Sequence, residues 1–210
     1  MKKHILVLFL FSAISVISLA QPFEGVMDFN KISAVDTIKY RYYVKGNNVR
    51  IEEMNKKGVI AGIMLVDLVK GNILALSPDR KMYMEVPALS KPIITGKVEV
   101  NKTSGTKIIN GYTCKLWRMR NKAENTEVSY WVAEDKFDFF NGLLKVLNRK
   151  DKLSVYFMQA PTVVGAMALE ATERNLLRDF KNAIVTTKIE KKVLDASLFS
   201  IPAEYKKYDK

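Results

Sequence analysis

Residues 36–52 read DTIKYRYYVKGNNVRIE, and their alternation decides the fold class. One face of residues 36–45 is apolar and carries Ile38, Tyr40, Tyr42 and Val44. The opposite face is mostly Lys and Arg, and such a period of two is typical of a strand with one buried face. Gly-Asn-Asn at 46–48 tolerates the positive φ angles of a tight turn, after which residues 49–52 alternate again. The segment therefore predicts a β-hairpin.

The same alternation extends on both sides of this hairpin and predicts an antiparallel meander of six strands in the first hundred residues. The run 59–69 is almost continuously apolar, which predicts a central strand covered on both faces. A Pro-containing connection follows at 87–96. Further strands are predicted at residues 106–109, 112–119, 127–133, 166–174 and 183–193. No segment repeats at a fixed period of 20–50 residues, which excludes solenoids and propellers.

One helix is predicted over residues 135–149, because Phe137, Phe140, Leu144 and Leu147 recur at helical spacing. About eleven antiparallel strands have to curl or close to hide their edges, and the apolar stripe of the helix needs a concave surface. The sequence therefore predicts an α+β, mainly antiparallel β fold. We expect an unclosed half-barrel of about eleven strands with one principal helix packed in its hollow, formed by residues 21–210 as a single domain.

Residues 1–20 have the pattern of a cleaved secretory signal peptide. Lys2, Lys3 and His4 precede a short apolar run that closes on Ser18-Leu19-Ala20. A transmembrane anchor is the alternative, but a spanning helix needs roughly 20 apolar residues. We therefore expect export to the periplasm rather than to the exterior, with no transmembrane segment after cleavage.

The scarcity of His and Cys excludes several classes of protein. Cleavage after Ala20 would remove His4, the only histidine of the 210 residues. Without His the chain cannot run Ser-His-Asp or Cys-His catalysis, and it lacks the commonest ligand of zinc, copper and non-haem iron. Cys114 is the only cysteine, so it forms no intramolecular disulfide. We interpret it as a small buried apolar residue, with a reactive thiol as the alternative.

No motif supports catalysis. Ser104-Gly105-Thr106-Lys107 matches the S-x-x-K pattern of serine acyl-transfer enzymes, but the accompanying S-D-N and K-T-G motifs do not occur. Adjacent carboxylates such as Glu52-Glu53 point to opposite faces of a strand. We predict no catalytic residues, no cofactor and no metal ion. The 34 Lys and Arg against 22 Asp and Glu are spread along strand exteriors and turns, which favours a solvated surface over a nucleic-acid partner.

Soft apolar side chains, mainly Met and Phe, are the remaining unusual feature. They fill a core in the ordinary case, but Met also suits adaptable binding surfaces. A curled sheet beneath an apolar helix forms a suitable cavity for an acyl chain. We predict that apolar residues, rather than charged ones, line such a cavity: Tyr40, Tyr42, Ile63, Leu65, Met82, Met84, Phe137, Phe140 and Leu144.

Several short motifs together resemble an exported bacterial family called domain of unknown function 4412. They are FEG at 23–25, YVKG at 43–46, VRIE at 49–52, GTKIINGYTC at 105–114, YWVA at 130–133 and LFSIP at 198–202 before Tyr205. That family is similar to the LolA/LolB lipoprotein-carrier superfamily. The resemblance implies an unclosed antiparallel barrel with helices in its hollow, and no established activity. The segment 111–114 also resembles GLPGLI-type exported proteins of Bacteroidetes, although their namesake motif is missing.

These observations lead to two functional hypotheses. The first is a non-enzymatic periplasmic protein that binds a hydrophobic ligand, such as a lipid, an acyl chain or a lipoprotein, between the curved sheet and the helix. The alternative is an envelope protein-protein interaction or sensor module with a filled core and no ligand. An enzyme comes third, with carboxylates or Ser104 and Lys107 as its only candidates. The sequence indicates no oligomeric state.

Overall fold

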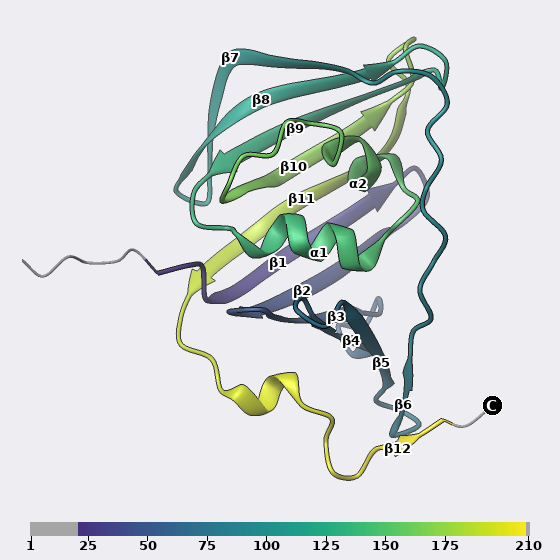
Figure 1. Cartoon of the computed structure of the whole chain (residues 1–210), viewed down its shortest axis with the longest axis vertical. Coiled ribbons are helices and arrows are strands. Elements are labelled where there is room, and N and C mark those ends of the chain that lie inside the picture. The colour runs from purple at the N-terminus through teal and green to yellow at the C-terminus, as the bar shows by residue number, and fades with distance from the viewer. Residues whose placement is uncertain (1–20, 209–210) are drawn as a thin grey trace, which may run out of the picture.

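The computed structural model describes residues 21–208, so the predicted signal peptide lies outside the described residues. The strands are β1 (Gly25–Ser33), β2 (Thr37–Lys45), β3 (Asn48–Met54), β4 (Ile60–Asp67), β5 (Asn72–Ser77), β6 (Met82–Glu85), β7 (Glu99–Ile109), β8 (Tyr112–Asn121), β9 (Thr126–Glu134), β10 (Ala166–Arg174), β11 (Phe180–Lys191) and β12 (Lys206–Lys207). They form one sheet in the order β12-β6-β5-β4-β3-β2-β1-β11-β10-β9-β8-β7. The sheet curls without closing (Figure 1). The predicted mainly antiparallel half-barrel is therefore confirmed.

Strand β1 joins two antiparallel meanders at the middle of this sheet. On one side it pairs with β2, and the meander continues through β3, β4 and β5 to β6. On its other side it pairs with β11, with Gly25 opposite Lys191. From β11 the second meander runs back through β10, β9 and β8 to β7. The six strands predicted in the first hundred residues are the first meander.

Two helices lie in the hollow of the sheet (Figure 1). Helix α1 (Phe139–Leu147) is the predicted principal helix, but it is shorter than the expected 135–149. Asn148 ends it by adopting a left-handed conformation with φ of 43°. Helix α2 (Lys152–Phe157) was not predicted. Its N-terminus is capped by Asp151, whose carboxylate accepts a hydrogen bond from the Ser154 backbone N–H at 3.0 Å. The segment between β9 and β10 therefore contains two short helices joined by a turn, instead of one long helix.

Three strand predictions need correction. The strand expected at 106–109 begins earlier, as β7, and the strand expected at 183–193 is β11 with both ends shifted toward the N-terminus. The short β12, which pairs in parallel with β6, was missed. Its two lysines are exposed and carry no alternation that could signal a strand.

The C-terminal segment after β11 crosses the outer face of the first meander (Figure 1). It includes a 3₁₀ helix, η1 (Ala196–Phe199), before β12. Outward-facing Ile63, Leu65 and Leu76 form a buried cluster against Ile201 and Tyr205 of this segment. On the other face, β4 contributes Met64 and Val66 to the main core. The prediction that the run 59–69 is covered on both faces is therefore confirmed for residues 63–66 and wrong at its two ends, where Val59 and Val69 are exposed.

The core between the helices and the inner face of the sheet is aromatic. Trp117 stacks on Phe157 of α2, with ring centroids 5.8 Å apart. The Tyr130 hydroxyl donates a hydrogen bond to the Leu153 carbonyl at 2.9 Å, which holds α2 against β9. Cys114 is fully buried in this core, and burial raises its thiol pKa to about 11. The prediction of a buried apolar cysteine is confirmed.

Glu124 ties the turn between β8 and β9 to two other segments. Its carboxylate accepts hydrogen bonds from Lys152 Nζ at 2.6 Å and from the Tyr156 hydroxyl, both on α2. It also accepts one from the Thr95 backbone N–H at 3.0 Å, in the connection between β6 and β7. Burial alone would raise the pKa of Glu124, but the hydrogen bonds from Lys152 and Tyr156 outweigh burial and hold the pKa below its usual value.

Gly165 fixes the entry to α1. Its carbonyl accepts hydrogen bonds from the backbone N–H groups of Asp135 and Phe137, both at 3.2 Å. Its φ is +71°, and a Cβ atom at this position would lie 2.3 Å from the Asp135 carbonyl oxygen. No side chain fits this approach.

We expect Gly165→Ala to destabilise the protein by about 1–2 kcal/mol for the left-handed conformation and by about 1–3 kcal/mol more for separating the packed atoms. Gly111→Ala is the control, because its φ is +84° and the space around it is open. In urea unfolding, the free energy of unfolding of the Gly111→Ala variant should fall only by the part due to the left-handed conformation. Equal losses in the two variants would contradict the role of the close approach.

We expect Glu124→Gln to lower the free energy of unfolding at pH 7 by about 2 kcal/mol, because the amide loses the charge attraction to Lys152 and has only one acceptor oxygen for the three donors. A carboxylate whose folded-state pKa is lowered stabilises the fold above its unfolded pKa, and the contribution is lost as the pH falls through the folded pKa. The difference from the wild type should therefore shrink when unfolding is measured from pH 6 down to pH 3.

Glu99→Gln is the matched control, because Glu99 forms only an exposed ion pair, with its Oε1 atom 4.0 Å from Lys122 Nζ. This variant should match the wild type at every pH. A Glu124→Gln deficit that stays constant down to pH 3 would show that the carboxylate charge is not what stabilises the turn.

Candidate functional site

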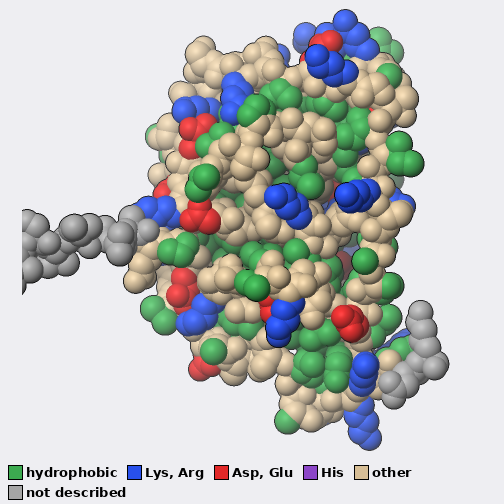
Figure 2. Space-filling model, viewed as in Figure 1, with side chains coloured by type: hydrophobic (Ala, Val, Ile, Leu, Met, Phe, Trp, Pro, Cys, Tyr) green, Lys and Arg blue, Asp and Glu red, His purple; other side chains and the backbone are tan. Residues whose placement is uncertain are grey.

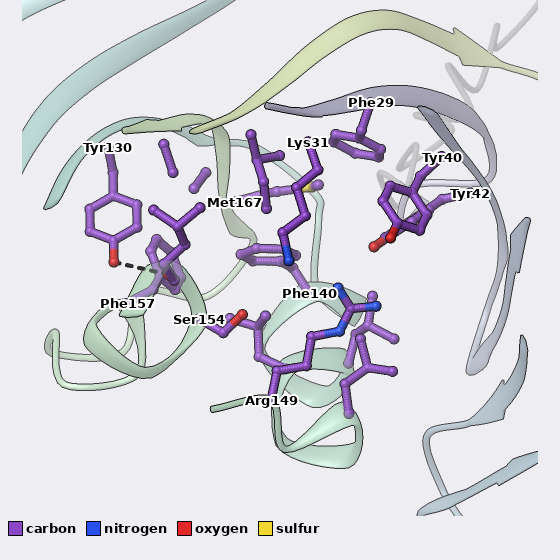
Figure 3. A pocket seen from close by; sticks show the side chains of 17 residues that line it. Phe29, Lys31, Tyr40, Tyr42, Tyr130, Phe140, Arg149, Ser154, Phe157 and Met167 are labelled. Carbon is purple, nitrogen blue, oxygen red and sulfur yellow. Dashed lines mark hydrogen bonds between the residues drawn. The ribbon is translucent and has the colours of Figure 1, made fainter. Parts of the chain in front are cut away.

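A cavity lies between the two helices and the inner face of β1, β2, β9, β10 and β11 (Figure 3). Its volume is about 70 Å³. The walls are largely apolar and include Phe29, Tyr42, Phe140, Leu144, Phe157 and Met167. An apolar cavity of about 150 Å³ admits a benzene molecule. In this conformation the site therefore has room for the end of an apolar chain rather than for a whole lipid.

Period-two alternation supplies the sheet side of this cavity. Met27, Phe29 and Lys31 follow one another on the inner face of β1, and the last two line the cavity. On β2, Tyr40 lies directly opposite Phe29, and Tyr42 lies opposite Met27. The rings of Phe29 and Tyr42 are 4.8 Å apart. The register of this one strand pair therefore builds an aromatic wall.

The helices supply the other side. Phe140 of α1 and Phe157 of α2 meet edge to face, with ring centroids 5.3 Å apart. Leu143, Leu144 and Leu147 of α1 also line the cavity, because helical spacing puts them on the stripe that faces the sheet.

The structure brings together four of the nine predicted lining residues: Tyr40, Tyr42, Phe140 and Leu144. The other five lie elsewhere. Ile63 and Leu65 face outward and pack beneath the C-terminal segment. Met82 and Met84 are partly buried on β6, near the edge of the sheet. Phe137 is core, packed against Phe23 and Tyr112 with centroids 5.2 and 5.1 Å away. The nine residues therefore do not form one site, and ligand binding by the four stays a prediction.

Two charged residues line the cavity, contrary to the expectation of an uncharged lining. They are Lys31 of β1 and Arg149 of the turn between the helices. The alternation of β1 could have placed Lys31 on the inner face. The apolar run at 153–157, which forms α2, could have identified the far wall, because it supplies Leu153 and Phe157.

The tyrosines of the cavity stay neutral at physiological pH. The Tyr40 hydroxyl donates a hydrogen bond to Glu53 Oε2 at 3.0 Å. Burial, followed by the negative charge of Glu53, raises the pKa of Tyr40 to about 12. Burial likewise raises the pKa of Tyr42 and of Tyr130. The Tyr42 hydroxyl makes no hydrogen bond within residues 21–208, which leaves a free donor at the cavity.

Of the two residues considered for acyl-transfer catalysis, Lys107 is held in an ion pair and Ser104 lies on the surface. Lys107 Nζ binds both carboxylate oxygens of Glu170, at 2.8 and 2.7 Å. Ser104 is exposed on β7.

Among the described residues, no three His, Cys, Asp or Glu side chains are grouped closely enough to hold a metal ion. No helix in residues 21–208 has the length and apolarity needed to cross a membrane. Charged side chains are scattered over the face shown in Figure 2 instead of forming one patch.

The fold is similar to several solved structures. An uncharacterized conserved protein from Thermus thermophilus has a TM-score of 0.50 and 8% identity, over 90% of this chain and 91% of that one. PNGF-II has a TM-score of 0.48 and 12% identity over 89% of this chain but only 31% of its own. A putative outer membrane lipoprotein-sorting protein domain from Vibrio parahaemolyticus has a TM-score of 0.32 and 10% identity, over 83% and 87% of the two chains.

At these identities the likeness concerns the fold alone. No curated protein matches the chain. The model of the family described as Domain of unknown function (DUF4412) matches residues 23–205. This match spans the motifs from FEG at 23–25 to Tyr205 that suggested the resemblance. The chain therefore belongs to the DUF4412 family.

Proposed function

We propose that the protein is a non-enzymatic periplasmic carrier or sensor that holds an apolar ligand in the cavity beneath α1 and α2. The observation that supports this most is an apolar cavity of about 70 Å³ in the hollow of the sheet, walled by side chains from five strands and both helices. Close-packed interiors contain few voids larger than a water molecule. A void with apolar walls at the centre of the fold therefore favours a ligand of the same character.

Binding of a long chain requires the helices to move outward, because the cavity is too small for it. The two helices are only nine and six residues long. The Asn148 side chain fastens the turn between them, by donating to the Leu89 carbonyl at 2.7 Å. Met167 on the wall is flexible enough to repack around a ligand. We infer that this short helical pair shifts outward to enlarge the site, which breaks the Asn148 hydrogen bond.

Location in the periplasm is supported by the signal-peptide pattern of residues 1–20 and by the exported family that the motifs resemble. The similarity of that family to lipoprotein carriers favours a lipid, an acyl chain or a lipoprotein as the ligand. The small cavity volume favours the second candidate function, an envelope interaction or sensor module with a filled core. The two candidates differ in whether wild-type protein takes up an apolar molecule.

We expect protein recovered from the periplasm of its own host to carry a bound apolar molecule. Native mass spectrometry should then show a species heavier than the polypeptide, and extraction with organic solvent should return it to the polypeptide mass. Recovery of bare polypeptide alone, together with no thermal shift on adding dodecan-1-ol, would exclude the carrier and leave the interaction module.

Ala168→Leu tests whether the cavity is the binding site. Ala168 is partly exposed on β10 and lines the cavity, so the three added carbon atoms fill it. We expect the affinity for dodecan-1-ol, measured by calorimetry, to fall at least about tenfold, while filling the void raises stability by about 1 kcal/mol.

The matched control is Ala34→Leu, in the exposed turn between β1 and β2. It should change neither quantity. Unchanged binding of dodecan-1-ol by the Ala168→Leu variant would place the ligand outside this cavity.

A further inference from the structure

We propose that the ligand is an anionic amphiphile: a single acyl chain enters the cavity, and its terminal carboxylate or phosphate lies between Lys31 and Arg149. This inference rests on the proposed function and specifies the class of ligand. The apolar walls already argue for a chain. The chemistry of the two cations argues for the charge at its end.

Lys31 occupies an unusual position for a cation. It follows Met27 and Phe29 in the inner row of β1, so its side chain points into the hollow instead of toward solvent. Its direct neighbours in the sheet are apolar on both sides, with Ile38 opposite on β2 and Ile184 opposite on β11. A partly buried ammonium among isoleucines is poorly solvated, and an anion that approaches it restores the lost interaction.

Lys31 also differs from the other partly buried cations of the first meander. Arg41 pairs with Asp28 at 2.7 Å, Lys45 with Glu24 at 3.0 Å, and Arg50 with Glu52 at 2.7 Å. Lys31 has no carboxylate within 4.0 Å in the part of the chain that the structure describes. Each of the other partly buried cations in this meander has its own acid, and Lys31 has none.

Arg149 supplies the second charge from the opposite side. It lies in the turn between the two helices, and it too has no ion pair among residues 21–208. In Figure 3 the Lys31 side chain runs from β1 toward the helices, and the Arg149 side chain runs from the turn toward the sheet, so both ends lie at the same cavity. Two like charges placed together repel each other, and an anion between them relieves the repulsion.

Two carboxylates beside residues of the cavity lining, those of Glu53 and Asp151, already accept hydrogen bonds. Glu53 accepts the hydrogen bond of Tyr40, and Asp151 accepts hydrogen bonds from the backbone N–H and hydroxyl of Ser154. The free hydroxyl of Tyr42 adds a third donor on the cavity wall. Two cations and the Tyr42 hydroxyl are thus available to an anion, and no carboxylate is among the residues that line the cavity. A guanidinium with an ammonium beside it suits a carboxylate or phosphate, which accepts several hydrogen bonds at once.

Titration calorimetry with purified protein and three twelve-carbon probes tests this inference. The probes are dodecanoate, dodecyl phosphate and the neutral dodecan-1-ol, with inorganic phosphate alone as a fourth ligand. We expect both anionic probes to bind at least about tenfold more tightly than the alcohol. Their relative affinities identify the preferred headgroup. Inorganic phosphate should bind weakly, because it lacks the chain.

The variants Lys31→Gln and Arg149→Gln should each weaken the binding of dodecanoate and dodecyl phosphate much more than that of dodecan-1-ol, so that the preference for the anion is lost. Lys39→Gln is the matched control, because Lys39 is an exposed cation on the neighbouring strand β2, and it should behave as wild type. Circular dichroism and melting temperature verify that each variant is folded.

The outcomes distinguish failure of the headgroup site from failure of the proposed carrier function. Equal affinity for alcohol and anions, or variants that weaken all three probes alike, would overturn the headgroup site and leave the carrier standing. Inorganic phosphate binding as tightly as dodecyl phosphate would also overturn it, since the chain would then contribute nothing. Failure of all three probes to bind would refute the proposed function itself.

Discussion

The packing of α1 and α2 against the inner face of the sheet is the interaction on which the structure depends. An open sheet of twelve strands presents an apolar inner surface, and the two helices cover it together with residues of the segments that flank them, such as Phe137 and Val163. Two short helices have to shield it, and they reach it mainly through aromatic side chains such as Phe140 and Phe157. The void left between these rings and the strands is where the candidate site lies. The contact that covers the inner face of the sheet therefore also forms the candidate site.

Strands could be predicted well because alternation is local. β10 was predicted with its observed bounds. The strands of the first meander could be predicted from their turn residues and their period-two alternation alone. Features that depend on distant partners could not be predicted. β12 exists because the C-terminal segment returns to β6, and α2 depends on the cap at Asp151 and on the hydroxyl of Tyr130. β12 leaves no pattern in its own sequence, and the apolar run of α2 is too short to show by its spacing that it is a helix.

The candidate site was harder to predict than the fold, because a cavity depends on which faces meet. Tyr40 and Phe140 were identified from the apolar faces of their own elements, and these faces do meet. Ile63 and Leu65 are equally apolar, but β4 is covered on both sides, so their row faces the C-terminal segment. Lys31 was overlooked because charge usually marks the outer face. Alternation within β1, taken without regard to residue type, places it inside.

The central position of β1 also governs when the fold can be completed. β1 is synthesised early, but one of its two partners is β11, and Gly25 lies opposite Lys191. Until β11 arrives, β1 is an edge strand with unpaired backbone groups, which are prone to join other chains. Contacts between segments so far apart in sequence slow folding. The half-made protein therefore carries an unpaired edge at what becomes its middle, and this edge is covered only when the last long strand has been made.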